Sequence, residues 1–268
     1  MGIRLNIMKI RLLFALCIAG CFSAQNKNDK EQKNLSEIEV KFLYSTVKDT
    51  TDLANRIEEM MILDVNPNSS LYYSDAFLQR RKSIEAELMM AKNSGEMAKI
   101  DAGKIAKPKV DYSVYRTSGK NFVTSRLGTD LFTFEGESPK WVTNFKDEKT
   151  ILGYKCKKAT TTFNKRQYVA WYTKEIPISD GPYRFKGLPG LAMEVEDVNG
   201  YDTFKAVGIE KKQIEIAQLQ NGIPVSRDEY LKKREEFKSN PYPSKIMDKG
   251  RRNQLADAIK KFNNSLER

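Results

Sequence analysis

Apolar and polar residues alternate in many short segments of this 268-residue chain, which is the pattern of half-buried β-strands. In the first of these segments, Ile38, Val40, Phe42 and Tyr44 are separated by polar residues. Similar segments follow at 60–65, 71–73, 112–115, 122–124, 131–134, 141–142, 154–156, 160–163, 168–172, 193–195 and 204–209. Short strands separated by turn residues predict an antiparallel meander.

The spacing of apolar residues changes to a helical one between positions 75 and 92. There Phe77, Ile84 and Leu88 fall on one face of a helix, and Gly95 follows its end. Residues 95–109 lack strand-forming residues and are predicted to form a mobile loop. Two further helices are predicted at 227–238 and 245–266.

These elements predict an α+β fold built on a single curved antiparallel β-sheet. The helix at 75–92 is expected to pack on the inner face of the sheet, and the C-terminal helices close the chain. The half-open barrel of the lipoprotein-carrier type is the best analogy, and it concerns the fold alone. We predict a signal peptide at 1–24, a polar tether at 25–36, a β-rich domain at 37–222 and a basic helical extension at 223–268.

The N-terminus has the features of an export signal. Lys9 and Arg11 precede an apolar run at 12–20, which is too short to span a bilayer but has the length of a signal-peptide core. Two cleavage sites fit: a lipobox-like sequence before Cys21, which would leave that cysteine acylated, and a site after Ala24. Both predict a protein of the periplasm or the outer membrane.

The residue types that are missing exclude most familiar catalytic sites. The sequence contains no histidine, which excludes Ser-His-Asp and Cys-His catalysis and His-based metal ligation. Cys156 would be the one cysteine left after export apart from an acylated Cys21, and its strand context favours a buried side chain. No phosphate-binding loop or dinucleotide fingerprint is present. We therefore expect no enzymatic activity, no cofactor and no metal site.

The formal net charge is +11, and basic residues are concentrated toward the C-terminus. A basic C-terminal segment can contact anionic lipid headgroups or an acidic partner, although a solvated helical face is the commoner explanation. Contact with a membrane surface therefore stays open. Nucleic acid is not expected as a partner, because the chain is predicted to be exported and shows no interleaved basic and aromatic groove.

The most distinctive segment is the block at 171–197, which has Gly-Leu-Pro-Gly-Leu at 187–191. This block resembles the signature of the GLPGLI family, envelope proteins found widely in Bacteroidetes-type bacteria, although Ala192 stands where the family name has Ile. The family has no established activity, so the resemblance implies a compartment and a fold. The matching positions are 151–159, Arg166, 170–173, 175–177, 181–182 and 187–191.

The centre of the block is predicted to be a type II turn over 188–191. Proline favours φ of about −65° at the second position, and Gly190 supplies the positive φ that follows. Because Phe185, Leu188 and Leu191 surround Pro189, the turn either packs in the core, which we favour, or forms an apolar lip that contacts a ligand or partner.

Several side chains near the turn are candidates for contact with a ligand or partner. Trp171 and Tyr172 are adjacent on a strand, so they point to opposite faces. Glu194 and Glu196 share one face of a strand. A polar face that is turned to solvent explains this pattern better than a catalytic acid–base pair of carboxylates does. Four basic residues near the block could bind an anionic headgroup or carboxylate: Arg166, Lys174, Arg184 and Lys186. The candidate contacts are Trp171, Tyr172, Tyr183, Phe185, Leu188, Pro189, Leu191 and Arg166.

The sequence thus predicts a non-enzymatic, exported envelope protein of the GLPGLI type. It would bind an apolar or amphipathic ligand, or an outer-membrane protein partner, in the concavity of the sheet near the turn. The alternatives are a structural subunit of an outer-membrane assembly and a His-free enzyme that uses carboxylates.

Overall fold

The computed structural model describes residues 34–98, 100–101, 103, 105–241 and 248–268, and residues 34–268 form one compact unit. The predicted signal peptide and residues 25–33 of the predicted tether lie outside the described residues. Within the described part of the chain, no helix is long and apolar enough to cross a membrane.

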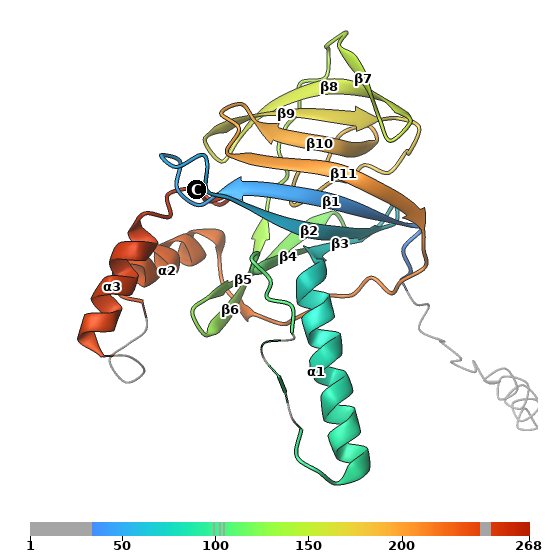
Figure 1. Cartoon of the computed structure of the whole chain (residues 1–268). Coiled ribbons are helices and arrows are strands. Elements are labelled where there is room, and N and C mark those ends of the chain that lie inside the picture. Colours follow the sequence, from blue (N-terminus) through green and yellow to red (C-terminus); the bar gives the residue numbers. More distant parts are fainter. Residues whose placement is uncertain (1–33, 99, 102, 104, 242–247) are drawn as a thin grey trace, which may run out of the picture. The chain divides into compact units, whose positions relative to one another are not determined.

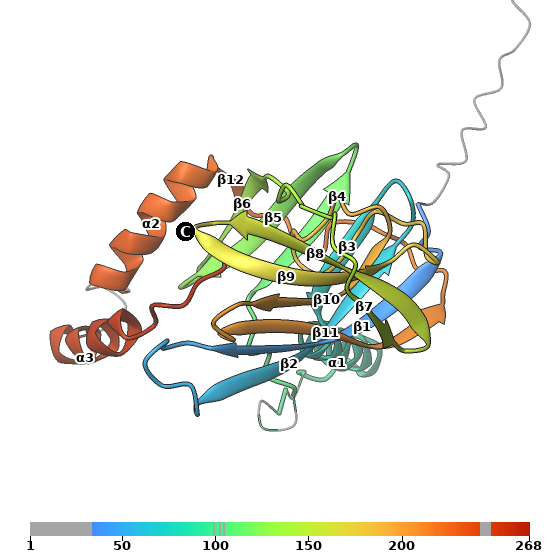
Figure 2. The ribbon, with the colours of Figure 1, turned by 90° about the horizontal axis from the view of Figure 1, so that it is seen from above.

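A single sheet dominates the described part of the chain and confirms the predicted α+β class (Figures 1 and 2). Its strand order is β12-β6-β5-β4-β3-β2-β1-β11-β10-β9-β8-β7, and neighbours are antiparallel except that β12 runs parallel to β6. The strands are β1 (Ile38–Val47), β2 (Arg56–Val65), β3 (Ser70–Ser74), β4 (Tyr112–Thr117), β5 (Lys120–Leu127), β6 (Asp130–Gly136), β7 (Glu148–Ile151), β8 (Tyr154–Phe163), β9 (Arg166–Thr173), β10 (Leu191–Asp197), β11 (Asp202–Lys211) and β12 (Ile223–Pro224).

The alternating pattern determines which side chains enter the main core. Tyr72, Val114 and Val123 point to one face, called here the inner face, where the main hydrophobic cluster lies. Their neighbours point the other way, because successive side chains of a strand alternate. Tyr73 belongs to a smaller cluster on this outer face, together with Ile62.

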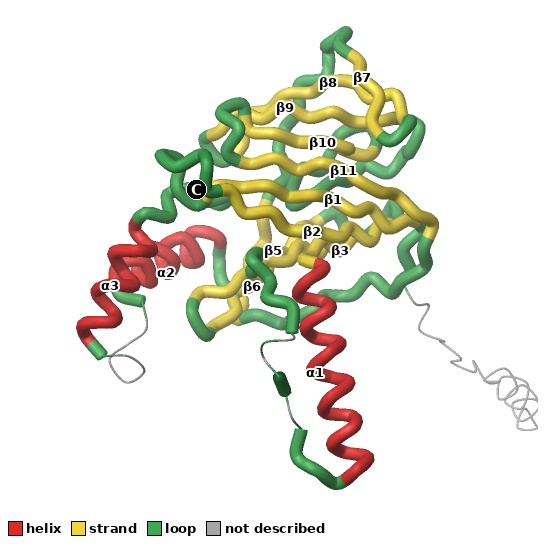
Figure 3. The backbone as a smooth tube through the Cα atoms, viewed as in Figure 1, coloured by secondary structure: helices red, strands yellow, loops and turns green. Residues whose placement is uncertain are grey.

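The helix α1 (Asp75–Ser94) starts and ends at the predicted sites. Ser74 accepts a hydrogen bond from Phe77 N at 3.1 Å, and Gly95 ends the helix with φ of 71°. The helix packs on the outer cluster through Leu78, and none of its residues is buried. The expected packing on the inner face is therefore wrong, and Figure 3 shows most of the helix extending away from the sheet.

The C-terminal segment contributes α2 (Arg227–Ser239) and α3 (Lys249–Lys260). Tyr230 of α2 is buried and stacks on Phe134 of β6, with 4.5 Å between ring centroids. The last helix was predicted over 245–266, but α3 ends at Lys260. The chain then returns to the core, where Leu266 is buried.

Two sequence interpretations of strands need correction. Strands β7 and β12 were not predicted, because each is short and carries little apolar alternation. The segment at 141–142 forms only an isolated bridge, between Val142 and Thr160.

Candidate functional site

The distinctive 174–190 segment fills the inner side of the curved sheet. Phe185 is fully buried. The centroid of its ring lies 4.7 Å from the ring centroid of Tyr168, 5.5 Å from that of Phe204 and 5.8 Å from that of Phe163. Tyr183 is also buried, at 1% exposure. These aromatic residues form the centre of the core, so neither ring lies on the exposed surface.

The Gly-Leu-Pro-Gly-Leu turn packs into the core as favoured from the sequence. Leu188 and Leu191 are at most 1% exposed, whereas Pro189 is exposed. Gly190 has the expected positive φ, and any side chain there would overlap the carbonyl oxygen of Thr173. The hydrogen bonding differs from a type II turn, because Gly190 N donates to Leu188 O at 2.8 Å.

Lys186 of this block is paired inside the protein. Lys186 Nζ donates to Asp180 Oδ1 and, at 3.0 Å, to Ser70 Oγ. Arg116 Nε donates to the second oxygen of Asp180 at 2.6 Å. Although burial opposes it, the charges of Lys186 and Arg116 hold the pKa of Asp180 below its usual range. Lys186 is therefore committed to structure, while Lys174 is exposed.

Arg166 and Arg184 are likewise committed. Arg166 Nη1 donates to Asp202 Oδ2 at 2.8 Å, and Arg184 Nη2 donates to Glu267 Oε2 at 2.9 Å. Arg184 is 1% exposed, which makes Glu267 its essential counter-charge. Neither guanidinium is open to a ligand from solvent.

The strand residues Trp171 and Tyr172 do point to opposite faces. Tyr172 is buried, whereas Trp171 is half-buried and carries Lys149 Nζ at 4.5 Å from its ring centroid. The same ammonium donates to Glu194 at 2.8 Å, so Glu194 belongs to an ion pair. Cys156 is buried as expected, and burial raises the pKa of its thiol to about 11.

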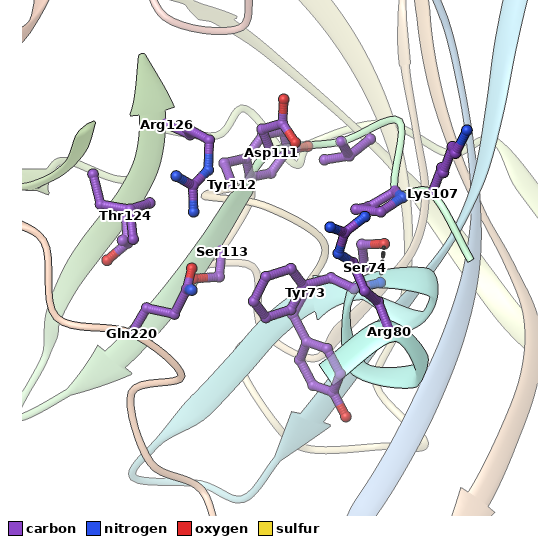
Figure 4. A pocket seen from close by; sticks show the side chains of 14 residues that line it. Tyr73, Ser74, Arg80, Lys107, Asp111, Tyr112, Ser113, Thr124, Arg126 and Gln220 are labelled. Atoms are coloured by element: carbon purple, nitrogen blue, oxygen red, sulfur yellow. Dashed lines mark hydrogen bonds between the residues drawn. The ribbon is translucent and has the colours of Figure 1, made fainter. Parts of the chain in front are cut away.

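A cavity of about 420 Å³ lies elsewhere, on the outer face of the sheet. We call it the outer pocket. Its size falls in the range of about 300–1,000 Å³ that is usual for small-molecule sites. Figure 4 shows residues from several elements converging on it. The side chains that line it include those of Tyr73, Arg80, Lys107, Ser113, Arg126 and Gln220.

Tyr73 forms an ordered aromatic wall of the outer pocket. It is 3% exposed, and its hydroxyl donates to Asp64 Oδ2 at 2.9 Å. Burial raises the pKa of Asp64 to about 6, despite this hydrogen bond. The wall is therefore fixed at both ends, by packing of the ring and by a buried carboxyl group.

Several polar side chains of the outer pocket are not committed to other parts of the protein. Arg80, Lys107 and Asp111 have no salt bridge to any described residue, and the side chains of Ser113 and Gln220 have no hydrogen bond to one. These groups can bind a ligand without breaking an existing contact.

A second cavity, of about 190 Å³, lies on the inner face of the same strands. We call it the inner pocket. Tyr183 donates its hydroxyl to Glu267, Tyr44 donates to Asp202 at 2.8 Å, and Tyr230 donates to Ser125 at 2.9 Å. The polar groups of the inner pocket are thus largely used in holding the core together.

The hydroxyls of Tyr72 and Tyr112 on the inner side are not used in this way, because both are buried and neither has a hydrogen-bond partner among the described residues. Of these two residues, Tyr112 lines the inner pocket. Its ring contacts Tyr72 and Tyr183, with centroids 6.5 Å and 5.4 Å away. A single unsatisfied hydroxyl in a small cavity is weak support for a binding site, because one water molecule could satisfy it.

No residue of the outer pocket was predicted from the sequence to be functional. Arg80, Lys107, Arg126 and Gln220 lie far apart in the sequence and belong to no motif. The alternation in β5 was the one available signal, because Thr124 and Arg126 share the face opposite Val123.

A family model described as "N-glycanase peptide, N-terminal domain" matches residues 97–229. This stretch resembles that domain. It contributes ten of the fourteen residues that line the outer pocket, and it contains the whole 171–197 block. None of the curated proteins matches the chain in sequence.

Solved structures give weaker likenesses. Two crystal forms of PNGF-II superpose with TM-scores of 0.49 and 0.48, at 14% and 16% identity, and each match covers 73% of this chain and 32% of PNGF-II. This chain thus spans about a third of the length of PNGF-II. An uncharacterized conserved protein from Thermus thermophilus gives a TM-score of 0.34 at 6% identity, covering 71% of this chain and 90% of that protein. Superpositions at this level carry no functional information.

The family match corrects the sequence-based assignment. The GLPGLI resemblance is wrong, because the family model that covers the block is that of the N-glycanase N-terminal domain. The predicted role in binding an apolar or amphipathic ligand at the turn fails with it. Leu188 and Leu191 are buried, so the features that suggested a family and an apolar lip serve to fill the core.

Proposed function

We propose that this chain is a non-catalytic domain that binds a glycan in the outer pocket. The observation that carries the proposal is the set of uncommitted polar groups there, beside the ordered ring of Tyr73. Sugars present several hydroxyl groups and apolar ring faces, so they are bound by convergent hydrogen-bonding groups next to aromatic side chains.

The family match supports this choice of ligand. The matched domain takes its description from an N-glycanase, and the matched stretch builds most of the outer pocket. The inner pocket depends more on residues outside the match, including Tyr44 and Glu267. The outer pocket is therefore the better site for a property related to glycans.

We also propose that the chain has no catalytic activity. The sequence has no histidine, and the buried thiol of Cys156 is held protonated by its raised pKa. Incubation of the purified chain with a glycopeptide should leave the glycopeptide mass unchanged. Release of the glycan by the chain would overturn this part of the proposal.

Binding is tested with a pair of matched variants in one connecting segment. Gln220→Trp places a bulky ring in the outer pocket, whereas Gln213→Trp places the same ring at an exposed position that does not line it. We expect the full-length chain to bind free N-glycans by calorimetry or on a glycan array. Gln220→Trp should weaken binding at least tenfold, and Gln213→Trp should not change it.

Two results would reject the proposal. One is a folded wild-type chain that binds no glycan at millimolar concentration. The other is equal binding by both tryptophan variants with unchanged melting temperatures, which would place any glycan site outside the outer pocket.

We also propose that the protein is exported, on the evidence of Lys9, Arg11 and the apolar run at 12–20. Intact-mass measurement of the native protein should show a chain that lacks this run. Added diacylglycerol mass on Cys21 would select the lipoprotein cleavage site. Retention of residues 12–20 would reject export by this signal.

A further inference from the structure

The outer pocket is lined by more positive than negative side chains. Arg80, Lys107 and Arg126 contribute cations, and Asp111 contributes the single carboxylate. Within the described ranges, none of the three cations lies within salt-bridge distance of a carboxylate. From this imbalance we infer that the outer pocket selects glycans whose bound sugar carries a negative charge.

The two arginines are held by regular elements of the fold. Arg80 belongs to α1 and Arg126 to β5, and Figure 4 places them on opposite sides of the cavity. Arg126 Nη1 donates to Thr129 O at 3.1 Å, which orients the guanidinium and leaves its other N–H groups available. A planar guanidinium matches a carboxylate, sulfate or phosphate group in two-point hydrogen bonding.

Two other cations on the same elements are paired. Arg81 follows Arg80 on α1 and forms an ion pair with Glu85 at 2.7 Å. Lys120, at the other end of β5 from Arg126, pairs with Glu135 at 2.9 Å. Arg81 and Lys120 are thus each neutralised by a carboxylate on the same or the neighbouring element, whereas Arg80 and Arg126 are not neutralised by any described residue.

The remaining polar groups suit the uncharged part of such a ligand. Asp111 can accept hydrogen bonds from sugar hydroxyls, and Ser113 and Gln220 can both donate and accept. The cavity of about 420 Å³ has room for one or two sugar rings, so the inference concerns a terminal acidic sugar. It rests on the proposed glycan-binding function and adds the class of glycan.

The experiment compares one biantennary N-glycan with and without its terminal sialic acids, using calorimetry on the full-length chain. Lactose, 3′-sulfolactose and lactose phosphate extend the comparison to sulfate and phosphate. The sialylated glycan should bind roughly tenfold more tightly than its neutral counterpart at low salt. The difference should shrink as sodium chloride is raised, since salt screens exposed charges.

Variants assign the effect to the two arginines. Arg80→Ala combined with Arg126→Ala should reduce binding of the acidic glycan to the level of the neutral one. The double Lys replacement at the same positions keeps the charge and should retain part of the preference. Lys232→Ala with Lys249→Ala removes two exposed cations that do not line the pocket, and should leave the preference unchanged.

The outcomes separate this inference from the proposed function. Equal binding of the neutral and sialylated glycans overturns the acidic preference and leaves glycan binding intact. Absence of binding to every glycan overturns both. Binding of inositol hexaphosphate as tightly as the sialylated glycan, with no binding of any neutral sugar, shows a general anion site and overturns the glycan function.

Discussion

The two faces of strands β4 and β5 carry pockets of different character. On the inner face, the hydroxyls of Tyr183 and Tyr230 are hydrogen-bonded to other parts of the core. On the outer face, Arg80, Lys107 and Asp111 have no ionic partner in the described part of the chain. Polar groups that are committed to one another stabilise the fold, whereas uncommitted groups can hold a ligand.

The difference has a simple physical origin. A buried polar group without a partner costs about 1–3 kcal/mol, which favours pairing within the inner face, as the hydroxyls of Tyr183 and Tyr230 show. On the outer face, water satisfies the same kinds of group before a ligand arrives. The comparison therefore predicts large stability effects at buried, paired groups and small ones at the unpaired groups that line the outer pocket.

The largest loss of stability is expected for Glu267→Ala. The carboxylate accepts hydrogen bonds from Tyr183 and from Arg184 and Arg227, each guanidinium at 2.9 Å, and its removal leaves Arg184 buried without a counter-charge. Breaking a buried pair in this way costs about 3–5 kcal/mol. Urea unfolding measures the change.

Glu235→Ala is the matched control, because Glu235 is an exposed carboxylate that pairs with Lys238 at 3.0 Å. It should change stability by less than about 0.5 kcal/mol. Similar losses in the two variants would contradict the assignment of the inner carboxylate to the core.

The second prediction concerns Asp64, behind the wall of the outer pocket. Its pKa of about 6 lies above the value of about 3.9 in an unfolded chain, so the folded state binds the proton more strongly. The contribution of Asp64 to stability is then complete below about pH 4 and is lost as the pH rises through about 6.

Asp64→Asn removes this dependence while keeping an oxygen acceptor for Tyr73. The variant should match the wild type near pH 3.5 and exceed its stability by about 1–3 kcal/mol at pH 7.5. Unfolding curves across that range provide the test. A difference that stays constant with pH would show that the charge of Asp64 is not the cause.

A pair of Tyr→Phe variants compares a hydroxyl that donates a hydrogen bond to a protein group with one that does not. Tyr183→Phe removes a donor to Glu267 and should cost about 1–2 kcal/mol. Tyr112→Phe removes a buried hydroxyl that has no partner among the described residues, so stability should stay the same or rise by up to about 1 kcal/mol. A clear loss in Tyr112→Phe would reveal a bound partner for that hydroxyl in the inner pocket.

The smallest stability effect is expected for the arginines of the outer pocket. Arg80→Ala and Arg126→Ala should each change the free energy of unfolding by about 0.5 kcal/mol or less, because exposed residues without strong contacts contribute little. Thermal melting measures the effect. A loss of several kcal/mol would show that these side chains support the fold, and the comparison between the two faces would fail.

Local patterns predicted the elements well where a strand has one buried face. The alternation of Ile38, Val40, Phe42 and Tyr44 corresponds to β1, and Gly95 ends α1 as expected. The short strands β7 and β12 carry too little pattern to be found. The position of α1 was mistaken because the spacing of Phe77, Ile84 and Leu88 does not say which face of a sheet a helix covers.

The residues of the candidate site could not be predicted from local sequence patterns either. The sequence drew attention to the 171–197 block because its apolar turn and aromatic residues are unusual, and these residues turned out to fill the core. The outer pocket joins residues as far apart as Arg80 and Gln220, whose proximity depends on long-range strand pairing. No local pattern marks such a set.

The sequence alone determined the strand-rich α+β class and the absence of histidine side chains, because each depends on residue type or on local spacing. Tertiary structure decided which polar groups pair with one another and which remain available to a ligand. That distinction depends on the partner opposite each side chain, as with Arg184 facing Glu267 in the core and Arg80 facing an open cavity. Partners of this kind are set by the curvature and pairing of the whole sheet.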